Sequence, residues 1–288
     1  MSLLHIIVLA VVQGLAELLP VSSSAHVIVA ERLMGMDPTS PETTLLLVML
    51  HTGTMFAVIV YFWRRWQRAF FQSAADLKKF VVGLVLAVLM TGIIGGGITE
   101  AIEKGLLRHQ PHAWMEQLWD RLDLVAAALA AVGVLILIAG LRERRPSAQS
   151  AAAPEIGLAQ SFWIGAVQGL CLPFRGFSRS GATISTGMFA GVAKVRAEDF
   201  SFALAVILTP VAIARESWRL FQSQHSHLGP ELTSSVRSSL IGAVFAFAAG
   251  LVALKWLSRW LEEGRWYWFG VYCLLAAGVV AYLYHSGY

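Results

Sequence analysis

Charged residues and cysteines are both scarce in this chain of 288 residues. Only 14% of the residues are charged, whereas 57% are hydrophobic and the mean hydropathy is +0.64. An ordinary soluble domain has about 25% charged residues, so this composition excludes a disordered chain and a basic nucleic-acid-binding module and disfavours most soluble enzymes. The two cysteines, Cys171 and Cys273, are too few for a disulfide scaffold or a cysteine-rich zinc site. We therefore expect membrane lipid, and not nucleic acid, as the macromolecular surroundings of the chain.

Long runs without Asp, Glu, Lys or Arg indicate membrane-spanning helices. Five such runs reach or nearly reach the roughly 17–25 residues that a span needs. They cover residues 45–63, 80–98, 124–141, 238–254 and 266–284. A sixth run, 200–218, contains Pro210 and ends with Arg215 and Glu216. We count it as a span because proline is tolerated in a membrane helix when neighbouring groups satisfy the freed carbonyl.

Two further apolar stretches contain too many helix-breaking and polar residues to be continuous spans. Residues 2–34 include Glu17, Pro20 and His26, and residues 160–193 include Pro173 and several glycines. We predict that each stretch forms a re-entrant helix–loop–helix hairpin, which enters the membrane and returns. The predicted fold class is an all-α polytopic membrane protein with six transmembrane helices and two re-entrant hairpins.

Basic residues in alternate loops predict the orientation. They lie after the first, third and fifth spans: Arg64, Arg65, Arg68, Lys78, Lys79, Arg142, Arg144, Arg145, Lys255, Arg259 and Arg265. The positive-inside rule places these loops in the cytoplasm and both termini outside, although a chance distribution of loop charge is the alternative. The first basic residue is Arg32, so we do not expect a cleaved signal peptide at the N-terminus.

An internal repeat relates the two halves of the chain. The tetrapeptide Val-Gln-Gly-Leu occurs at 12–15 and again at 167–170, and each copy precedes a proline, a serine-rich turn and three spans. An odd number of crossings inverts the second unit relative to the first, which places a working site where the two broken segments meet. We predict a first repeat over 1–150 and a second over 151–288, integrated into one membrane domain.

Ionisable residues inside membrane segments are functional candidates. Gln13 and Glu17 lie four residues apart, so they share one helix face. A carboxylate beside a carboxamide suits a divalent cation such as Mg²⁺ or Ca²⁺, and a carboxylate also suits proton transfer. A polar pair satisfied by the neighbouring turn is the alternative.

The first serine turn, Ser22, Ser23 and Ser24, precedes a predicted helix whose first turn contains His26. One serine suffices for an N-cap, so the others are candidates for binding an anion at the positive helix end. Cap and packing roles alone are the alternative, and His26 is either a structural residue or a catalytic one.

The second turn adds a fixed positive charge, Arg179, whose planar fork matches two phosphate oxygens. Glu17 or an anionic ligand has to neutralise this charge if it is buried. The neighbouring polar residues and glycine are candidate substrate-binding groups: Ser178, Ser180, Gly181 and Thr183. Arg175 either assists them or extends to an interface.

Several other polar and aromatic residues carry weaker expectations. His5, His51 and Thr52 are candidates for the same cavity, although core residues bonded to helix carbonyls are commoner. The tryptophans at the predicted span ends are expected in interfacial belts: Trp63, Trp66, Trp266 and Trp268.

The two turn motifs resemble the signatures of the undecaprenyl-diphosphate phosphatase family. Residues 13–26 (QGLAELLPVSSSAH) resemble the first signature and residues 175–183 (RGFSRSGAT) the second. The segments 51–54 (HTGT), 61–64 (YFWR) and 200–204 (FSFAL) also fit, so the resemblance covers nearly the whole chain. The chain departs from the common pattern at Gln13, Ala25 and Arg175.

The resemblance implies a fold of six spans with two re-entrant hairpins and an enzyme of the bacterial cytoplasmic membrane. It implies hydrolysis of undecaprenyl diphosphate, a polyprenyl diphosphate lipid, to undecaprenyl phosphate and phosphate at the outer face, which recycles the cell-wall lipid carrier. It also implies an association with bacitracin resistance. The family's acidic residue, histidine, serines and arginine correspond to Glu17, His26, Ser22, Ser23 and Arg179.

We therefore predict a phosphoric anhydride hydrolase with Glu17, Ser23, His26 and Arg179 as catalytic residues. Glu17 with Gln13 would bind Mg²⁺ or Ca²⁺ or position a base, and the nucleophile is a serine, His26 or water. The alternative is a polyprenyl-phosphate transporter, because an inverted repeat with broken helices is a common carrier architecture.

Overall fold

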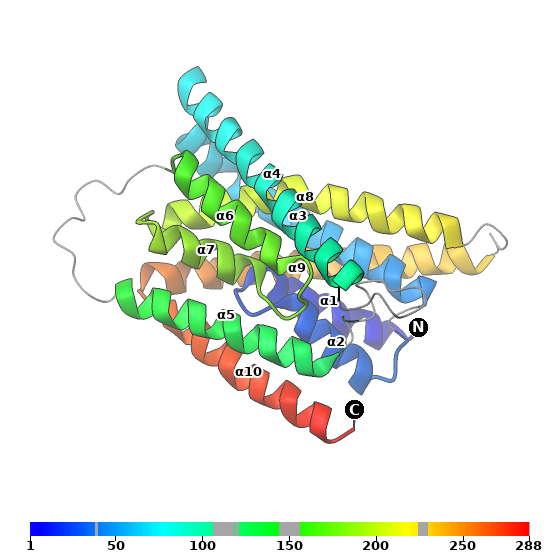
Figure 1. Ribbon diagram of the computed structural model, residues 1–288. Coiled ribbons are helices and arrows are strands. Elements are labelled where there is room, and N and C mark those ends of the chain that lie inside the picture. Colours follow the sequence, from blue (N-terminus) through cyan, green and yellow to red (C-terminus); the bar gives the residue numbers. More distant parts are fainter. Residues whose placement is uncertain (38–39, 106–117, 119–120, 144–155, 224–229, 288) are drawn as a thin grey trace.

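The computed structural model describes residues 1–37, 40–105, 118, 121–143, 156–223 and 230–287. These residues form ten α-helices and no strand (Figure 1). Six helices are long and apolar enough to cross a membrane. They are α3 (Pro41–Phe70), α4 (Ala74–Gly105), α5 (Leu122–Glu143), α8 (Lys194–Ser223), α9 (Pro230–Glu262) and α10 (Tyr267–His285). The predicted all-α membrane fold with six spans is confirmed.

Five of the six observed helices extend several residues beyond the predicted runs at one or both ends. A charge-free run shows only the apolar part of a helix. The helix itself continues through charged residues until its end is capped, so it is longer than the run. Helix α3, for example, begins after Ser40, whose Oγ accepts a hydrogen bond of 3.2 Å from the Thr43 N–H. It then continues through Arg64 and Arg68 to Phe70.

Two helix–loop–helix units occupy the predicted hairpin segments. The first contains α1 (Leu3–Leu18) and α2 (Ser23–Leu33), and the second contains α6 (Leu158–Cys171) and α7 (Arg179–Phe189). At 1.5 Å per residue these helices are about 17–24 Å long, shorter than the roughly 30 Å hydrocarbon core. Re-entry through one membrane face stays a prediction.

The order of elements is the same in the two halves: a short helix, a turn, a second short helix and three long helices. The repeated tetrapeptide explains the packing of the first helix in each half. A Cβ on Gly14 of α1 would lie 2.7 Å from the Ala246 carbonyl oxygen of α9, and one on Gly169 of α6 would lie 2.9 Å from the Gly95 nitrogen of α4. Glycine is therefore needed at both positions for close helix contact.

Each half thus places its first helix against a long helix of the other half, and α5 of one half runs beside α10 of the other (Figure 1). The inverted orientation of the two repeats stays a prediction. The predicted boundary at 150/151 lies outside the described residues, as do Arg144 and Arg145.

A buried ion cluster joins α3, α8 and α9. The Arg65 Nη2 lies 2.9 Å from Glu198 Oε2 and 2.8 Å from Asp199 Oδ1, and both acids are buried. The Ser258 hydroxyl donates to the other Glu198 oxygen at 3.2 Å. Because two buried carboxylates share one guanidinium, the cluster holds these helices in register.

Two of the tryptophans predicted in interfacial belts belong to the core instead. Trp66 is 6% exposed and donates its indole N–H to the Asp199 carbonyl at 3.1 Å. Trp266 is fully buried and donates to Ser185 Oγ at 3.1 Å. The belt prediction was wrong for these two because each indole N–H finds a polar partner inside the bundle.

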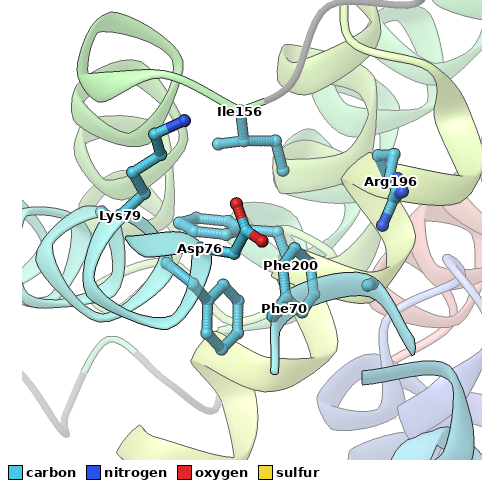
Figure 2. A pocket seen from close by; sticks show the side chains of 9 residues that line it. Phe70, Asp76, Lys79, Ile156, Arg196 and Phe200 are labelled. Carbon is cyan, nitrogen blue, oxygen red and sulfur yellow. The ribbon is translucent and has the colours of Figure 1, made fainter. Parts of the chain in front are cut away.

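A small cavity lies where α3 ends and α4 and α8 begin (Figure 2). Its apolar wall includes Phe70, Phe80 and Phe200, with the Phe70 and Phe80 rings stacked at 3.9 Å. The polar side chains around it are Asp76, Lys79 and Arg196 (Figure 2). Its volume of about 50 Å³ holds only a few water molecules, so the site for a lipid headgroup lies elsewhere.

Candidate active site

A larger cavity of about 590 Å³ lies between the two hairpin turns and the helices α3, α4 and α8. The hairpins contribute Glu17, the three serines Ser22–Ser24 and residues 174–180 with the exception of Gly176. Apolar side chains of α3 and α8, among them Leu47 and Leu208, form part of its wall. A largely apolar cavity with a few convergent polar groups is the usual form of a ligand site.

Arg179 and Glu17 form an ion pair in this cavity. The Arg179 Nη2 lies 2.6 Å from Glu17 Oε1, and the two side chains are 22% and 16% exposed. Arg179 is the first residue of α7 and Glu17 lies in the last turn of α1. The tips of the two hairpins therefore bring together the two charged residues that the sequence analysis singled out.

The second oxygen of Glu17 accepts a hydrogen bond from a hydroxyl. Ser23 Oγ donates to Glu17 Oε2 at 2.5 Å, and Gln13 Nε2 donates to the same oxygen at 3.2 Å. A hydroxyl within hydrogen-bond reach of a carboxylate is the geometry of a nucleophile beside its base. Arg179, on the other oxygen, fixes the orientation of that carboxylate.

One nitrogen of Arg179 has no partner among the described residues. The Nη1 atom is buried and makes no hydrogen bond to the described part of the chain, although the side chain lines the cavity. Leaving a donor of a charged group unsatisfied is unfavourable. The guanidinium therefore has capacity for an anionic ligand in addition to Glu17.

The serines of the first turn have different partners. Ser22 is the N-cap residue of α2 and is the one non-glycine residue of the described chain with a positive φ, 68°. Its hydroxyl pairs with Ser24 Oγ at 3.2 Å, and Ser24 Oγ accepts from the Gly176 N–H of the second hairpin at 3.2 Å. Ser23 is therefore the serine whose hydroxyl is directed at the carboxylate.

The candidate substrate-binding groups of the second turn mostly hold the protein together. Ser178 caps α7 by accepting from the Gly181 N–H at 3.2 Å, and Ser180 donates to the Leu19 carbonyl at 3.3 Å. Thr183 is fully buried and pairs with Ser201 of α8 at 2.6 Å. Ser178 and Ser180 line the cavity, whereas Gly181 and Thr183 do not.

Gly176 lets the turn of the second hairpin lie close to α5 while its backbone contacts the first hairpin. Its φ is +99°, a conformation that other residues rarely adopt, and a Cβ there would lie 2.5 Å from the Val125 carbonyl oxygen. The backbone N–H of this glycine is the group that reaches Ser24. Its neighbour Arg175 lines the cavity.

His26 is turned away from Glu17. Its Nδ1 lies 2.7 Å from the Ser22 carbonyl oxygen and its Nε2 lies 2.7 Å from the Tyr272 hydroxyl of α10. Both ring nitrogens thus have partners, and the side chain does not line the cavity. Action as a general acid or base would require His26 to release one of these partners.

Comparison with known proteins assigns the chain to a family. The family model described as bacitracin resistance protein BacA matches residues 6–280. The chain is 52% identical to undecaprenyl-diphosphatase 2 of Acinetobacter baylyi over 97% of each protein. It is 31% identical to undecaprenyl-diphosphatase of Rhodopirellula baltica, over 98% of each, and 33% identical to that of Desulfosudis oleivorans, over 96% of this chain and 97% of the relative.

The chain belongs to the BacA family. The resemblance drawn from the two signatures is confirmed, and the signature residues Glu17 and Arg179 of this BacA chain are the pair that meets in the cavity. The individual roles of the site residues stay predictions.

Two residues that line the cavity were weak candidates or no candidates for the site in the sequence. His51, a weaker candidate, donates from Nδ1 to the Leu47 carbonyl at 2.8 Å and places Nε2 3.8 Å from Glu17. Gln168 is buried, donates to Thr91 Oγ1 at 3.3 Å and leaves its Oε1 without a partner among the described residues. Its place in the repeated tetrapeptide, where it corresponds to Gln13, was the available signal.

The donor set for a divalent cation is small. No group of three or more His, Cys, Asp or Glu side chains that could hold a metal occurs in the described parts of this BacA chain. Glu17 is a suitable oxygen ligand, and Mg²⁺ commonly binds through one or two carboxylates together with substrate phosphates. Gln13 turns its amide nitrogen toward Glu17, so its oxygen would ligate a shared cation only after rotation of the amide.

Proposed function

We propose that this protein hydrolyses undecaprenyl diphosphate to undecaprenyl phosphate and inorganic phosphate, as the names of its curated relatives say of them. The single observation that best supports this function is the Arg179 guanidinium. It is paired with Glu17 through Nη2, and no residue that the structure describes partners the buried Nη1 beside the cavity. A guanidinium with free donor capacity is suited to the equatorial oxygens of a transferred phosphoryl group.

In the proposed reaction, Ser23 is the nucleophile. Its Oγ forms a bond to the terminal phosphorus, and its proton passes to Glu17, which already accepts that hydroxyl at 2.5 Å. The bond between the terminal phosphorus and the bridging oxygen breaks, and undecaprenyl phosphate leaves with that oxygen, which takes the proton from Glu17. Water then attacks the phosphorus of the phosphoserine and gives a proton to Glu17, which returns it to Ser23 Oγ as the bond between phosphorus and Oγ breaks and phosphate leaves.

Arg179 stabilises the charge that develops on the transferred phosphoryl group, because a preorganised donor directed at the developing charge acts strongly on a transition state. Ser22 and Ser24 support the turn that carries Ser23. Glu17 would hold a divalent cation, Mg²⁺ or Ca²⁺, together with the diphosphate oxygens. When bound, the cation would neutralise part of the substrate's negative charge.

The protein is a multi-pass membrane protein, and we propose that the cavity opens to the outer face of the cytoplasmic membrane. The cavity uses the Thr44–His51 part of α3 and the Ala205–Glu216 part of α8. These parts are remote from Arg64 and Arg68 on α3 and from Arg196 on α8. Both termini lie at one end of the molecule (Figure 1), and the positive-inside rule places that end outside.

Phosphate release by purified protein in detergent tests this function. Detergent removes the two sides of the membrane, so a carrier of polyprenyl phosphate would release no phosphate from a prenyl diphosphate. We expect release of one phosphate per lipid diphosphate, stimulated by Mg²⁺ or Ca²⁺. Absence of phosphate release from correctly folded protein, with long- and short-chain prenyl diphosphates and either cation, would contradict the proposal.

A further inference from the structure

Tyr272 is joined to the first hairpin although it lies on the last helix of the chain. Its hydroxyl is 2.7 Å from His26 Nε2, and the two rings stack with centroids 5.6 Å apart and planes inclined by 10°. The two residues are 246 positions apart in the sequence. Tyr272 lies outside both signature motifs, so the sequence did not predict this contact.

The hydrogen bond of His26 Nδ1 shows which ring nitrogen carries the proton. His26 Nδ1 lies 2.7 Å from the Ser22 carbonyl oxygen, which can only accept a hydrogen bond. Nδ1 therefore carries a hydrogen. In the neutral ring Nε2 is then an acceptor, and the Tyr272 hydroxyl donates to it.

The carbonyl held by His26 belongs to a strained residue. Ser22 has φ 68° without being a glycine, and its side chain does not cap α2. Such conformations are unfavourable and persist only where surrounding contacts maintain them. The His26 contact is one of these, and the next residue along the chain is Ser23, whose hydroxyl reaches Glu17 at 2.5 Å.

We propose that Tyr272 is a positioning residue of the active site. Its hydroxyl holds the His26 ring against the Ser22 carbonyl, and this contact keeps the Ser22 backbone in the conformation that presents Ser23 to Glu17. The inference rests on the proposed function for its consequence in catalysis, but the contact itself does not depend on that function. Tyr272 touches neither substrate nor the reacting atoms in this role.

The variant Tyr272→Phe tests the role by removing one oxygen and keeping the stacked ring. We expect kcat for phosphate release to fall about tenfold, because a small misplacement of a nucleophile slows the chemical step strongly. KM should stay within about twofold, since no substrate contact is lost. The matched control is Tyr282→Phe on the same helix, whose side chain is 71% exposed, and it should retain the activity of the wild-type protein.

Nitrogen NMR of histidine-labelled protein supplies a measurement that does not depend on activity. In the wild-type protein, His26 should show a protonated Nδ1 and an unprotonated Nε2 that accepts a hydrogen bond, and Tyr272→Phe should shift the Nε2 resonance. The signal is assigned as the one missing from His26→Gln. A wild-type spectrum with Nε2 protonated and Nδ1 free would overturn the proposal even if the variant could not be purified.

The kinetic outcomes separate this inference from the proposed function. If the wild-type protein hydrolyses prenyl diphosphates and Tyr272→Phe has the same kcat, or changes KM alone, the positioning role is wrong and the function stands. If the wild-type protein releases no phosphate, the function is wrong, and the NMR spectra decide whether Tyr272 still fixes the His26 ring.

Discussion

The Arg179 guanidinium and the Glu17 carboxylate lie 2.6 Å apart across 162 positions of the sequence. Each residue stands where a short helix meets a turn, one at the end of α1 and the other at the start of α7. Their contact joins the two hairpins, and it leaves one guanidinium nitrogen without a partner in the described structure. The same pair is therefore a structural link, and we propose that it is also a preformed anion site.

Replacing Arg179 by lysine tests the anion site. Arg179→Lys keeps a positive charge beside Glu17 but loses the planar fork that contacts two oxygens at once. We expect hydrolysis of prenyl diphosphate to fall at least about tenfold with normal membrane insertion. Arg259→Lys, at an exposed position of α9, is the control and should change the rate little. Turnover by Arg179→Lys close to that of the wild-type protein would contradict the phosphate role.

Glu17→Gln removes the base and the candidate cation ligand together. We expect hydrolysis to fall at least about a hundredfold, and the remaining rate should not respond to Mg²⁺ or Ca²⁺. In the wild-type protein, a chelator should abolish hydrolysis and either cation should restore it. Glu100→Gln, on the exposed end of α4, should respond to chelator and cation as the wild-type protein does. Normal cation-dependent hydrolysis by Glu17→Gln would make Glu17 a structural residue.

The covalent route predicts a phosphoserine at Ser23. Rapid acid quenching during turnover should trap one phosphate on a peptide that contains Ser23, and intact-protein mass spectrometry should detect the added mass. Ser23→Ala should abolish both the trapped phosphate and hydrolysis, whereas Ser73→Ala, at the start of α4, should keep both. Hydrolysis without any trapped phosphate, together with activity in Ser23→Ala, would favour direct attack by water.

Close packing of the repeated tetrapeptide predicts a stability effect. A side chain at position 14 would meet the Ala246 carbonyl and the Ala249 side chain, each at 2.7 Å from the Cβ. Gly14→Leu should therefore destabilise the protein by about 1–3 kcal/mol or more, because overpacking forces the helices apart. Gly92→Leu on α4 should be nearly neutral, because no described atom from another helix lies within 4 Å of the added Cβ. The midpoint of thermal unfolding in detergent measures both, and equal midpoints would argue against the contact between α1 and α9.

Arg65 is expected to stabilise the protein without taking part in catalysis. Arg65→Leu would leave Glu198 and Asp199 buried without their shared guanidinium, and breaking a buried ion pair from one side costs about 3–5 kcal/mol. Arg64→Leu, at the exposed neighbouring position, should cost little. Chemical unfolding of the two variants distinguishes them. Equal stability of both variants would show that the cluster adds nothing to the fold.

The sequence by itself determined the class of the protein, the number of its spans and the segments that carry the site. Charge-free runs long enough to cross a bilayer predict membrane-spanning helices. A carboxylate and an arginine inside apolar segments are costly to place in a membrane, so they and the serine turns beside them indicate a functional site. The repeated tetrapeptide likewise indicated that two equivalent turns meet. These features depend on local composition, which the sequence contains in full.

Only the tertiary structure decided which of these polar groups face one another. Ser23, and not its neighbours, reaches Glu17; Thr183 is directed to Ser201; and His26 is held by a tyrosine of the last helix. Trp66 and Trp266 lie in the core because the partners of their indole N–H groups are on other helices. A hydrogen bond between residues far apart in sequence depends on how helices pack, and no local pattern of residues records that distance.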